Sequence, residues 1–166
     1  MMPIVPIVSN DIIRNICYDI NVNITNKQID NASFLIQETL LKDTLTPDYY
    51  YSFTGITTGI TYNSYDQYVK DNFIDYIVSY GVWKHLIFTL SYQLYPDGLR
   101  KRTSDQSDYV EHEDINLLKS YIDNFINNKR QELKRYMIDN SNYYPLYFRS
   151  KWGDIPRAHN FIIDKI

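Results

Sequence analysis

The chain has 166 residues, a length that suits one domain with a modest hydrophobic core. Its net charge of −3 gives no overall attraction to nucleic acid or to an anionic membrane surface. Cys17 is the only cysteine, which excludes an internal disulfide and favours a reducing compartment.

Tyrosine is the most informative feature of the composition, with 17 copies in the chain. Two explanations stand side by side. An AT-rich genome favours tyrosine, isoleucine and asparagine codons together. Tyrosine also covers large interfaces at low entropic cost, because its ring is apolar and its hydroxyl can stay wet.

The N-terminal region begins with an apolar segment that contains two prolines and no basic cluster. This segment is too short for a signal peptide or a membrane span, so we expect a soluble protein made in the cytoplasm. A short helix is predicted from about residue 10 to residue 18, with an apolar side formed by Ile12, Ile13 and Ile16. Residues 19–24 alternate between apolar and polar side chains and predict a brief extended link.

A second helix is predicted to start at Thr25, because Thr25 and Gln28 have the spacing of a capping box. Its apolar face carries Ile29, Ala32, Ile36 and Leu40, and the helix should end before Pro47. Residues 47–63 are rich in tyrosine, threonine and glycine. They predict a loop with short strands near its two glycines.

The third helix has the strongest pattern. Residues 64–67 resemble another capping box, with Ser64 as the cap. Gly81 is the one position expected to weaken or kink this helix. A core stripe is favoured over a cofactor site for its apolar seam, which consists of Val69, Phe73, Tyr76, Tyr80, Trp83, Ile87, Leu90 and Leu94.

A charged arm interrupts the helical pattern after this seam. Pro96-Asp97-Gly98 cannot continue a helix and has the residues of a tight turn. A basic cluster of Arg100, Lys101 and Arg102 follows. The next helix then opens with acids, which its N-terminal dipole favours, and the acids of this region are Asp105, Asp108, Glu111, Glu113 and Asp114.

The fourth helix is predicted to begin between residues 107 and 113 and to stop near residues 140–142. Its seam is Ile115, Leu118, Ile122 and Phe125, continued by Leu133 and Met137. The fold class expected is mainly α, a small bundle of about four helices, two of them long, with a projecting loop or hairpin between the long pair. We expect residues 1–142 to form this domain, with the arm at 96–107, and residues 143–166 to form an extended tail.

No motif predicts catalysis, a metal site or a cofactor. The three histidines are isolated, and the acidic run around His112 lacks the HExxH spacing of a zinc site. Consecutive residues also point around a helix rather than toward one ion. Cys17 has no CxxC partner, and Gly55 to Gly59 lacks the Lys-Ser/Thr of a P-loop. We therefore expect a protein that is not an enzyme.

The basic cluster leaves three interpretations open. It can contact phosphate, although three cations without interleaved aromatic residues are a weak signal for nucleic-acid binding. It can be a solvated loop. It can also pair with the acidic segment that follows, either within one subunit or between subunits in a heterologous contact.

The order of these parts resembles the head–tail connector (adaptor or ring) proteins of tailed bacteriophages. It is most similar to the connector-like proteins of Bacteroidetes and crAss-like phages. The matching segments are PIVSNDIIRNI, IDNASFLIQETLL, YDQYVKDNFIDYIVSYGVWKHL, TLSYQLYPDGLRKRTSDQSD and DNSNYYPLY, which together span roughly residues 5 to 147. They are patterns of helix, aromatic residue and loop rather than catalytic motifs.

This resemblance implies a virion protein that forms a ring, usually a dodecamer, beneath the portal protein. It implies contacts with itself, the portal and other ring or tail proteins. DNA would pass through its channel without sequence-specific binding, and no membrane would be involved. The interface residues expected on the arm, the acidic helix start and the tail are Tyr95, Asp97, Arg100, Lys101, Arg102, Asp108, Glu111, Glu113, Asp114, Tyr147, Trp152, Phe161, Ile162 and Ile163. The alternative is a phage-encoded DNA-binding or regulatory protein that uses the basic arm.

Overall fold

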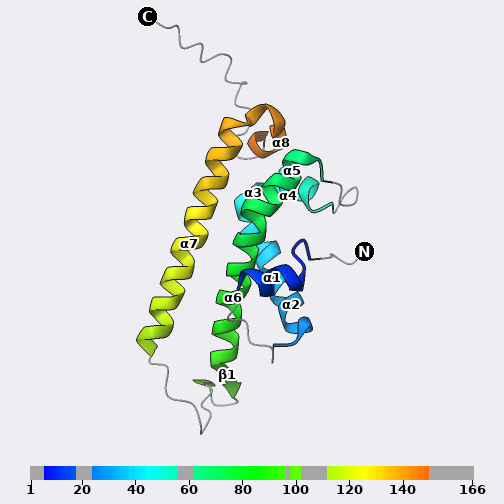
Figure 1. Cartoon of the computed structure of the whole chain (residues 1–166). Coiled ribbons are helices and arrows are strands. Elements are labelled where there is room, and N and C mark those ends of the chain that lie inside the picture. Colours follow the sequence, from blue (N-terminus) through cyan, green and yellow to red (C-terminus); the bar gives the residue numbers. More distant parts are fainter. Residues whose placement is uncertain (1–5, 18–23, 56–61, 96–97, 102–111, 150–166) are drawn as a thin grey trace, which may run out of the picture.

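The structure is a computed structural model of the chain, and it is mainly helical. It describes residues 6–17, 24–55, 62–95, 98–101 and 112–149, with the backbone alone at 90–95, 98–101 and 112–115. The predicted fold class, a small helical bundle, is confirmed (Figure 1). The predicted extended link falls mostly on residues 18–23 and lies outside the described residues.

The N-terminal half consists of short helices that pack around one long helix. α1 (Asn10–Ile16) is followed by α2 (Asn26–Ile36), which runs through the π-turn η1 (Gln37–Leu41) into α3 (Lys42–Leu45). α4 (Pro47–Phe53) follows at once. α5 (Ser64–Val69), the π-turn η2 (Lys70–Ile74) and α6 (Asp75–Ser91) then form one continuous helical segment.

The C-terminal half is dominated by one helix. A hairpin of β1 (Tyr92–Tyr95) and β2 (Gly98–Lys101) leads from α6 toward α7 (His112–Asp139). The 3-10 turn η3 (Ser141–Tyr143) and α8 (Pro145–Arg149) end the described chain. α6 and α7 lie antiparallel and in contact, and α1 and α2 pack against α6 (Figure 1).

The capping box predicted at the start of α2 is present in the structure. Thr25 Oγ1 accepts a hydrogen bond from the Gln28 backbone N–H, and the Gln28 side chain accepts one from the Thr25 N–H. The predicted cap of the third helix is wrong by one residue. Asn63 Oδ1 accepts from the N–H groups of Tyr65 and Asp66, which leaves Ser64 as the first helical residue.

The identity of the N-cap residue has a measurable effect on stability. Asn63→Ala should lower the free energy of unfolding by about 1 kcal/mol, because two N–H groups of the first turn lose their acceptor. Ser64→Ala is the matched control and should be nearly neutral. Urea denaturation of both variants checks the assignment. Equal losses would mean that the serine contributes to the cap as well.

The predicted loop at residues 47–63 is wrong in its first part, because Pro47–Phe53 is helical. Pro47 occupies the first turn, where its missing N–H and fixed φ are tolerated. Tyr49, Tyr50 and Phe53 are buried at the spacing of one helical face. The glycines and threonines that suggested strands lie at residues 54–61, and 56–61 are outside the described residues.

The buried line of the third helix also differs from the predicted seam. Val69 and Phe73 are buried as expected, but after η2 the buried positions become Ile77, Val78 and Val82, while Tyr76 is exposed. A π-turn carries one more residue than an α-turn, so it rotates everything that follows around the axis. An uninterrupted α-helical period therefore could not identify the core side of α6.

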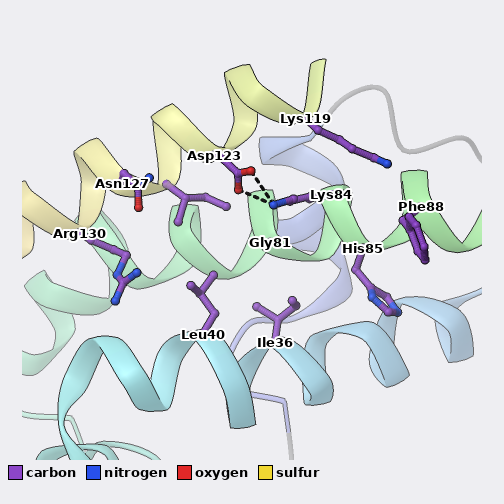
Figure 2. Close-up of a pocket in the computed structure, with 11 residues that line it drawn as sticks. Ile36, Leu40, Gly81, Lys84, His85, Phe88, Lys119, Asp123, Asn127 and Arg130 are labelled. Atoms are coloured by element: carbon purple, nitrogen blue, oxygen red, sulfur yellow. Dashed lines mark hydrogen bonds and ion pairs between the residues drawn. The ribbon is translucent and has the colours of Figure 1, made fainter. Parts of the chain in front are cut away.

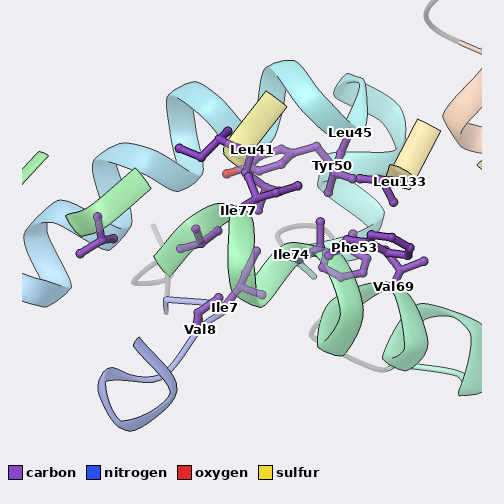
Figure 3. Close-up of a cluster of buried hydrophobic side chains, with 14 of the residues drawn as sticks. Ile7, Val8, Leu41, Leu45, Tyr50, Phe53, Val69, Ile74, Ile77 and Leu133 are labelled. Atoms are coloured by element: carbon purple, nitrogen blue, oxygen red, sulfur yellow. The ribbon is translucent and has the colours of Figure 1, made fainter. Parts of the chain in front are cut away.

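The core lies where α6 meets the other helices (Figure 3). Leu41, Leu45 and Tyr50 from the N-terminal helices contact the cluster that includes Ile77 and Leu133. The segment before α1 joins this core, because Ile7 and Val8 are buried and the Ile7 N–H donates to Gln37 Oε1 at 3.1 Å. Residues before the first helix therefore contribute to the stability of the bundle.

The predicted tail starts too early. Residues 143–149 form η3 and α8 rather than an extended segment, and Tyr144 and Tyr147 are buried. The ring of Tyr49 meets Tyr144 edge-on at 5.8 Å between centroids and Tyr147 at 6.2 Å. Burying these aromatic surfaces favours docking over extension. Residues 150–166 lie outside the described residues.

Candidate functional site

The charged arm begins as a β-hairpin. β1 and β2 are antiparallel, with Tyr95 opposite Gly98 and Tyr92 opposite Lys101. The hairpin lies at the end of α6, close to the start of α7 and far from α8 (Figure 1). Of the predicted interface residues, it contains Tyr95, Arg100 and Lys101. The turn residue Asp97 lies outside the described residues.

The acidic half of the arm reaches into α7. Glu113 and Asp114 occupy its first turn, near the same end of the bundle as the hairpin (Figure 1). Carboxylates in a first turn are favoured by the helix dipole. The backbone segments that carry two predicted acids and two predicted bases therefore lie toward the same end of the bundle. The other predicted interface residues lie outside the described residues, namely Arg102, Asp108, Glu111, Trp152, Phe161, Ile162 and Ile163.

Tyr147 is not available as an interface residue. Its side chain is buried in the core beside Tyr49, and its carbonyl accepts a hydrogen bond from Thr46 Oγ1 at 3.2 Å. Burial raises the pKa of its phenol. The prediction for Tyr147 is wrong because an aromatic residue after a proline can start a docked helix as readily as a tail.

The sequence did not predict a groove between α2, α6 and α7 (Figure 2). Its volume is about 440 Å³. Its apolar floor is formed by Ile36, Leu40, Gly81 and Ile126. The floor is shallow at Gly81, where an added Cβ would lie 2.7 Å from Ile36 Cγ2. This close approach of α2 to α6 is what glycine permits here.

Three cations surround this floor, and each has a partner. Lys84 Nζ lies 2.5 Å and 2.6 Å from the two carboxylate oxygens of Asp123. The Lys119 ammonium lies 4.9 Å from the centre of the Phe88 ring. Arg130 pairs with the carboxylate of Asp43. Asp123 is the only carboxylate among the lining residues, so the groove has an apolar base and a charged rim in which Lys84 and Arg130 are already paired.

The opposite side of the α6–α7 pair carries an aromatic ladder. Tyr80 stacks on Phe125 with ring centroids 4.0 Å apart, and Tyr68 stacks on Tyr136 at 4.9 Å. Tyr65 and Tyr143 continue the series with stacked rings 4.0 Å apart. Stacking across the seam locks the two long helices together. It also explains part of the tyrosine content within the monomer.

A buried polar cluster lies at η2, near the α8 end of the bundle. Lys70 Nζ donates to both carboxylate oxygens of Asp75, at 2.8 Å and 3.0 Å, and both side chains are nearly excluded from solvent. Burial raises the pKa of Asp75, and Lys70 opposes that rise. Tyr62 is close enough that burial, together with the Asp75 charge, raises its pKa to about 12.

Within the described residues, no group of three or more histidine, cysteine, aspartate or glutamate side chains could hold a metal ion. In the same part of the chain, no helix is long and apolar enough to cross a membrane. The candidate sites that the structure describes are the hairpin with the α7 start, and the groove.

Residues 32–157 match a family described as Family of unknown function (DUF6712), which is about three quarters of the chain. The chain belongs to this family. The match covers the hairpin, the whole groove and the aromatic ladder, and leaves out α1. No match was found among curated proteins or among solved structures.

The groove residues of this DUF6712 member do follow helical spacings in the sequence. Ile36 and Leu40 are four residues apart on one helix, and Gly81, Lys84 and His85 follow the same helical spacing on another. Nothing in one sequence says that these two faces meet. The sequence predicts that Gly81 weakens one helix, whereas in the structure two helices make close contact there.

Proposed function

We propose that this DUF6712 member is a structural virion protein that forms a ring at the portal–tail vertex of a tailed bacteriophage. In this role it extends the DNA channel and joins the portal protein to tail components. The resemblance of residues 5–147 to connector proteins motivates the proposal. The helical bundle and the hairpin between its long helices are compatible with it.

The observation that carries the proposal is the arrangement at the hairpin end of the α6–α7 pair. The strand that contains Arg100 and Lys101 and the helix start that contains Glu113 and Asp114 lie toward the same end of the bundle. A closed ring needs two different complementary surfaces on every subunit. Neighbouring segments of opposite charge at one end of the molecule suit that requirement, because one can face each neighbour.

Charge reversal of the arm tests this proposal. The triple variant Arg100→Glu, Lys101→Glu, Arg102→Glu should fold like the wild type but fail to form rings, since the cations then repel the acids they would meet. Circular dichroism checks folding, and mass photometry checks assembly. The control triple reverses the exposed residues Lys27, Lys134 and Arg135, with the same change in net charge. Normal ring formation by the arm variant would contradict its role.

The alternative is a DNA-binding or regulatory protein, which the basic cluster itself favours. Titration of duplex DNA at 50 and 200 mM salt separates the two functions. Tight binding with a steep loss at the higher salt would favour the regulator and overturn the structural proposal. A ring protein through which DNA slides should bind weakly at both concentrations.

A further inference from the structure

We propose that the groove between α2, α6 and α7 receives the N-terminal turns of α7 from a second copy of this chain. This inference rests on the proposed ring and adds a second contact between neighbours to the charge pairing of the arm. The occupant is the segment 113–121, with Leu117 and Tyr121 as its apolar anchors. The mode is a helix lying in a groove.

The groove has the chemistry of a site for an acidic amphipathic helix. Its floor presents Ile36, Leu40 and Ile126, and Phe88 stands half-exposed at one end. The lining carries Lys84, Lys119 and Arg130 with the carboxylate of Asp123, and Asp43 pairs with Arg130. A partner that brings apolar side chains together with negative charge suits this lining.

The start of α7 has the matching features. Leu117 and Tyr121 are the most exposed large hydrophobic side chains among the described residues, at 72% and 61%. They are four residues apart, so they share one face of the helix. Glu113 lies four residues before Leu117 and continues the same spacing, and Asp114 follows it. Two acids are thus followed by two apolar anchors on one helical surface.

The length of the groove can accommodate the length of the proposed segment. Along α7 the groove runs from Lys119 to Arg130, eleven steps of 1.5 Å, or about 16 Å. The segment from Glu113 to Tyr121 spans eight steps, or about 12 Å. One face of a helix of this length can therefore lie along the groove.

One subunit can use both surfaces at the same time. Lys119, which lines the groove, follows Leu117 by two residues, so their directions differ by about 200° around the helix axis. α7 therefore presents its own groove on one side and its anchors for a neighbour on another. A contact between two different surfaces propagates from copy to copy, and it closes as a ring when the rotation between neighbours divides a full turn.

Photo-cross-linking identifies the occupant directly. Phe88 is replaced by the aromatic photo-cross-linker p-benzoylphenylalanine in the full-length protein, which is mixed with isotopically labelled wild-type protein and irradiated. Mass spectrometry then reads the linked peptide. We expect links between position 88 of one copy and residues 113–121 of another.

Other outcomes are equally decisive. Assembled rings that link position 88 to residues 150–166, or that give no link between copies, would overturn the inference and leave the ring proposal standing. A wild-type protein that stays monomeric at every concentration would instead contradict the ring proposal itself.

A matched pair of substitutions gives a second test. Leu117→Asp should weaken association at least about tenfold. The leucine side chain is exposed in the monomer and would be buried in the contact, and aspartate lacks that apolar surface. Ile138→Asp is the control, since Ile138 is 52% exposed on the same helix and far from its start. Both changes affect exposed side chains, so both monomers should fold. Equal effects of the two variants would contradict the proposed contact.

Discussion

Replacing Lys70 with methionine is expected to lower the free energy of unfolding by about 3–5 kcal/mol at neutral pH. The substitution keeps the length of the side chain but leaves Asp75 buried without its cation. The wild-type pair is close, at 2.8 Å between Lys70 Nζ and Asp75 Oδ1, and both side chains are nearly excluded from solvent. Removing one partner of such a pair costs more than the pair itself contributes.

The loss should depend on pH in a defined direction. Burial already raises the pKa of Asp75 above its ordinary value of 3.8, and Lys70 limits that rise. Without Lys70 that pKa rises further in the folded state. Below pH 3.8 the carboxyl is neutral in both states and the cost is absent. Stability is then lost as the pH rises through the folded-state pKa.

Urea denaturation at pH 4.5 and pH 7.5 checks this prediction, with the wild type measured in parallel to remove the effect of other carboxylates. The variant should lie closer to the wild type at pH 4.5. The control is the double variant Lys70→Met, Asp75→Leu, which should recover most of the stability because no charge stays buried. A single variant as stable as the wild type at pH 7.5 would contradict the buried pair.

Gly81→Val should lower the free energy of unfolding by about 2 kcal/mol or more, because valine overpacks the contact between α2 and α6. Even a lone Cβ at this position would lie 2.7 Å from Ile36 Cγ2 and 3.2 Å from Leu40 Cδ2. The higher helix propensity of valine recovers only a few tenths of a kcal/mol. The steric cost is therefore expected to dominate.

A double-mutant cycle shows whether this cost comes from the named contact. Gly81→Ala with Ile36→Ala should be more stable than the sum of the single changes predicts, since the smaller side chain at position 36 makes room for the added methyl. Thermal or urea denaturation of the four proteins gives the coupling. If the effects of the two substitutions on the free energy of unfolding simply add, or if Gly81→Val is stabilising, then α2 and α6 can move apart at position 81 without cost.

Local signals in the sequence predicted the local structure well. The Thr25 capping box, the first helix and the end of α7 before Asn140 depend on neighbouring residues, and all three are confirmed. The sequence does not predict the helix at Pro47–Phe53, because the nearby glycines and threonines favour a loop, whereas Tyr49, Tyr50 and Phe53 are buried only by the tertiary core. Tertiary burial, rather than propensity, decides such a segment.

The candidate site was less predictable than the fold. The hairpin followed from Pro96-Asp97-Gly98, which is a short-range turn signal. The groove depends on which faces of α2, α6 and α7 meet, and the π-turn η2 rotates α6 away from the α-helical pattern. Tyr147 was misplaced for the same kind of reason, since its partner Tyr49 is 98 residues away in the chain.

The two π-turns have a further consequence for the length of the helices. In an α-helix, residues five apart do not face each other, yet the i→i+5 geometry of η2 places Lys70 against Asp75. Each π-turn holds one residue beyond the α-helical count. Members of the DUF6712 family that differ by a single residue within a long helix can therefore gain or lose it at 37–41 or 70–74 with the turns beyond kept in place. Homologous helices in such members would align only if a one-residue gap is allowed there.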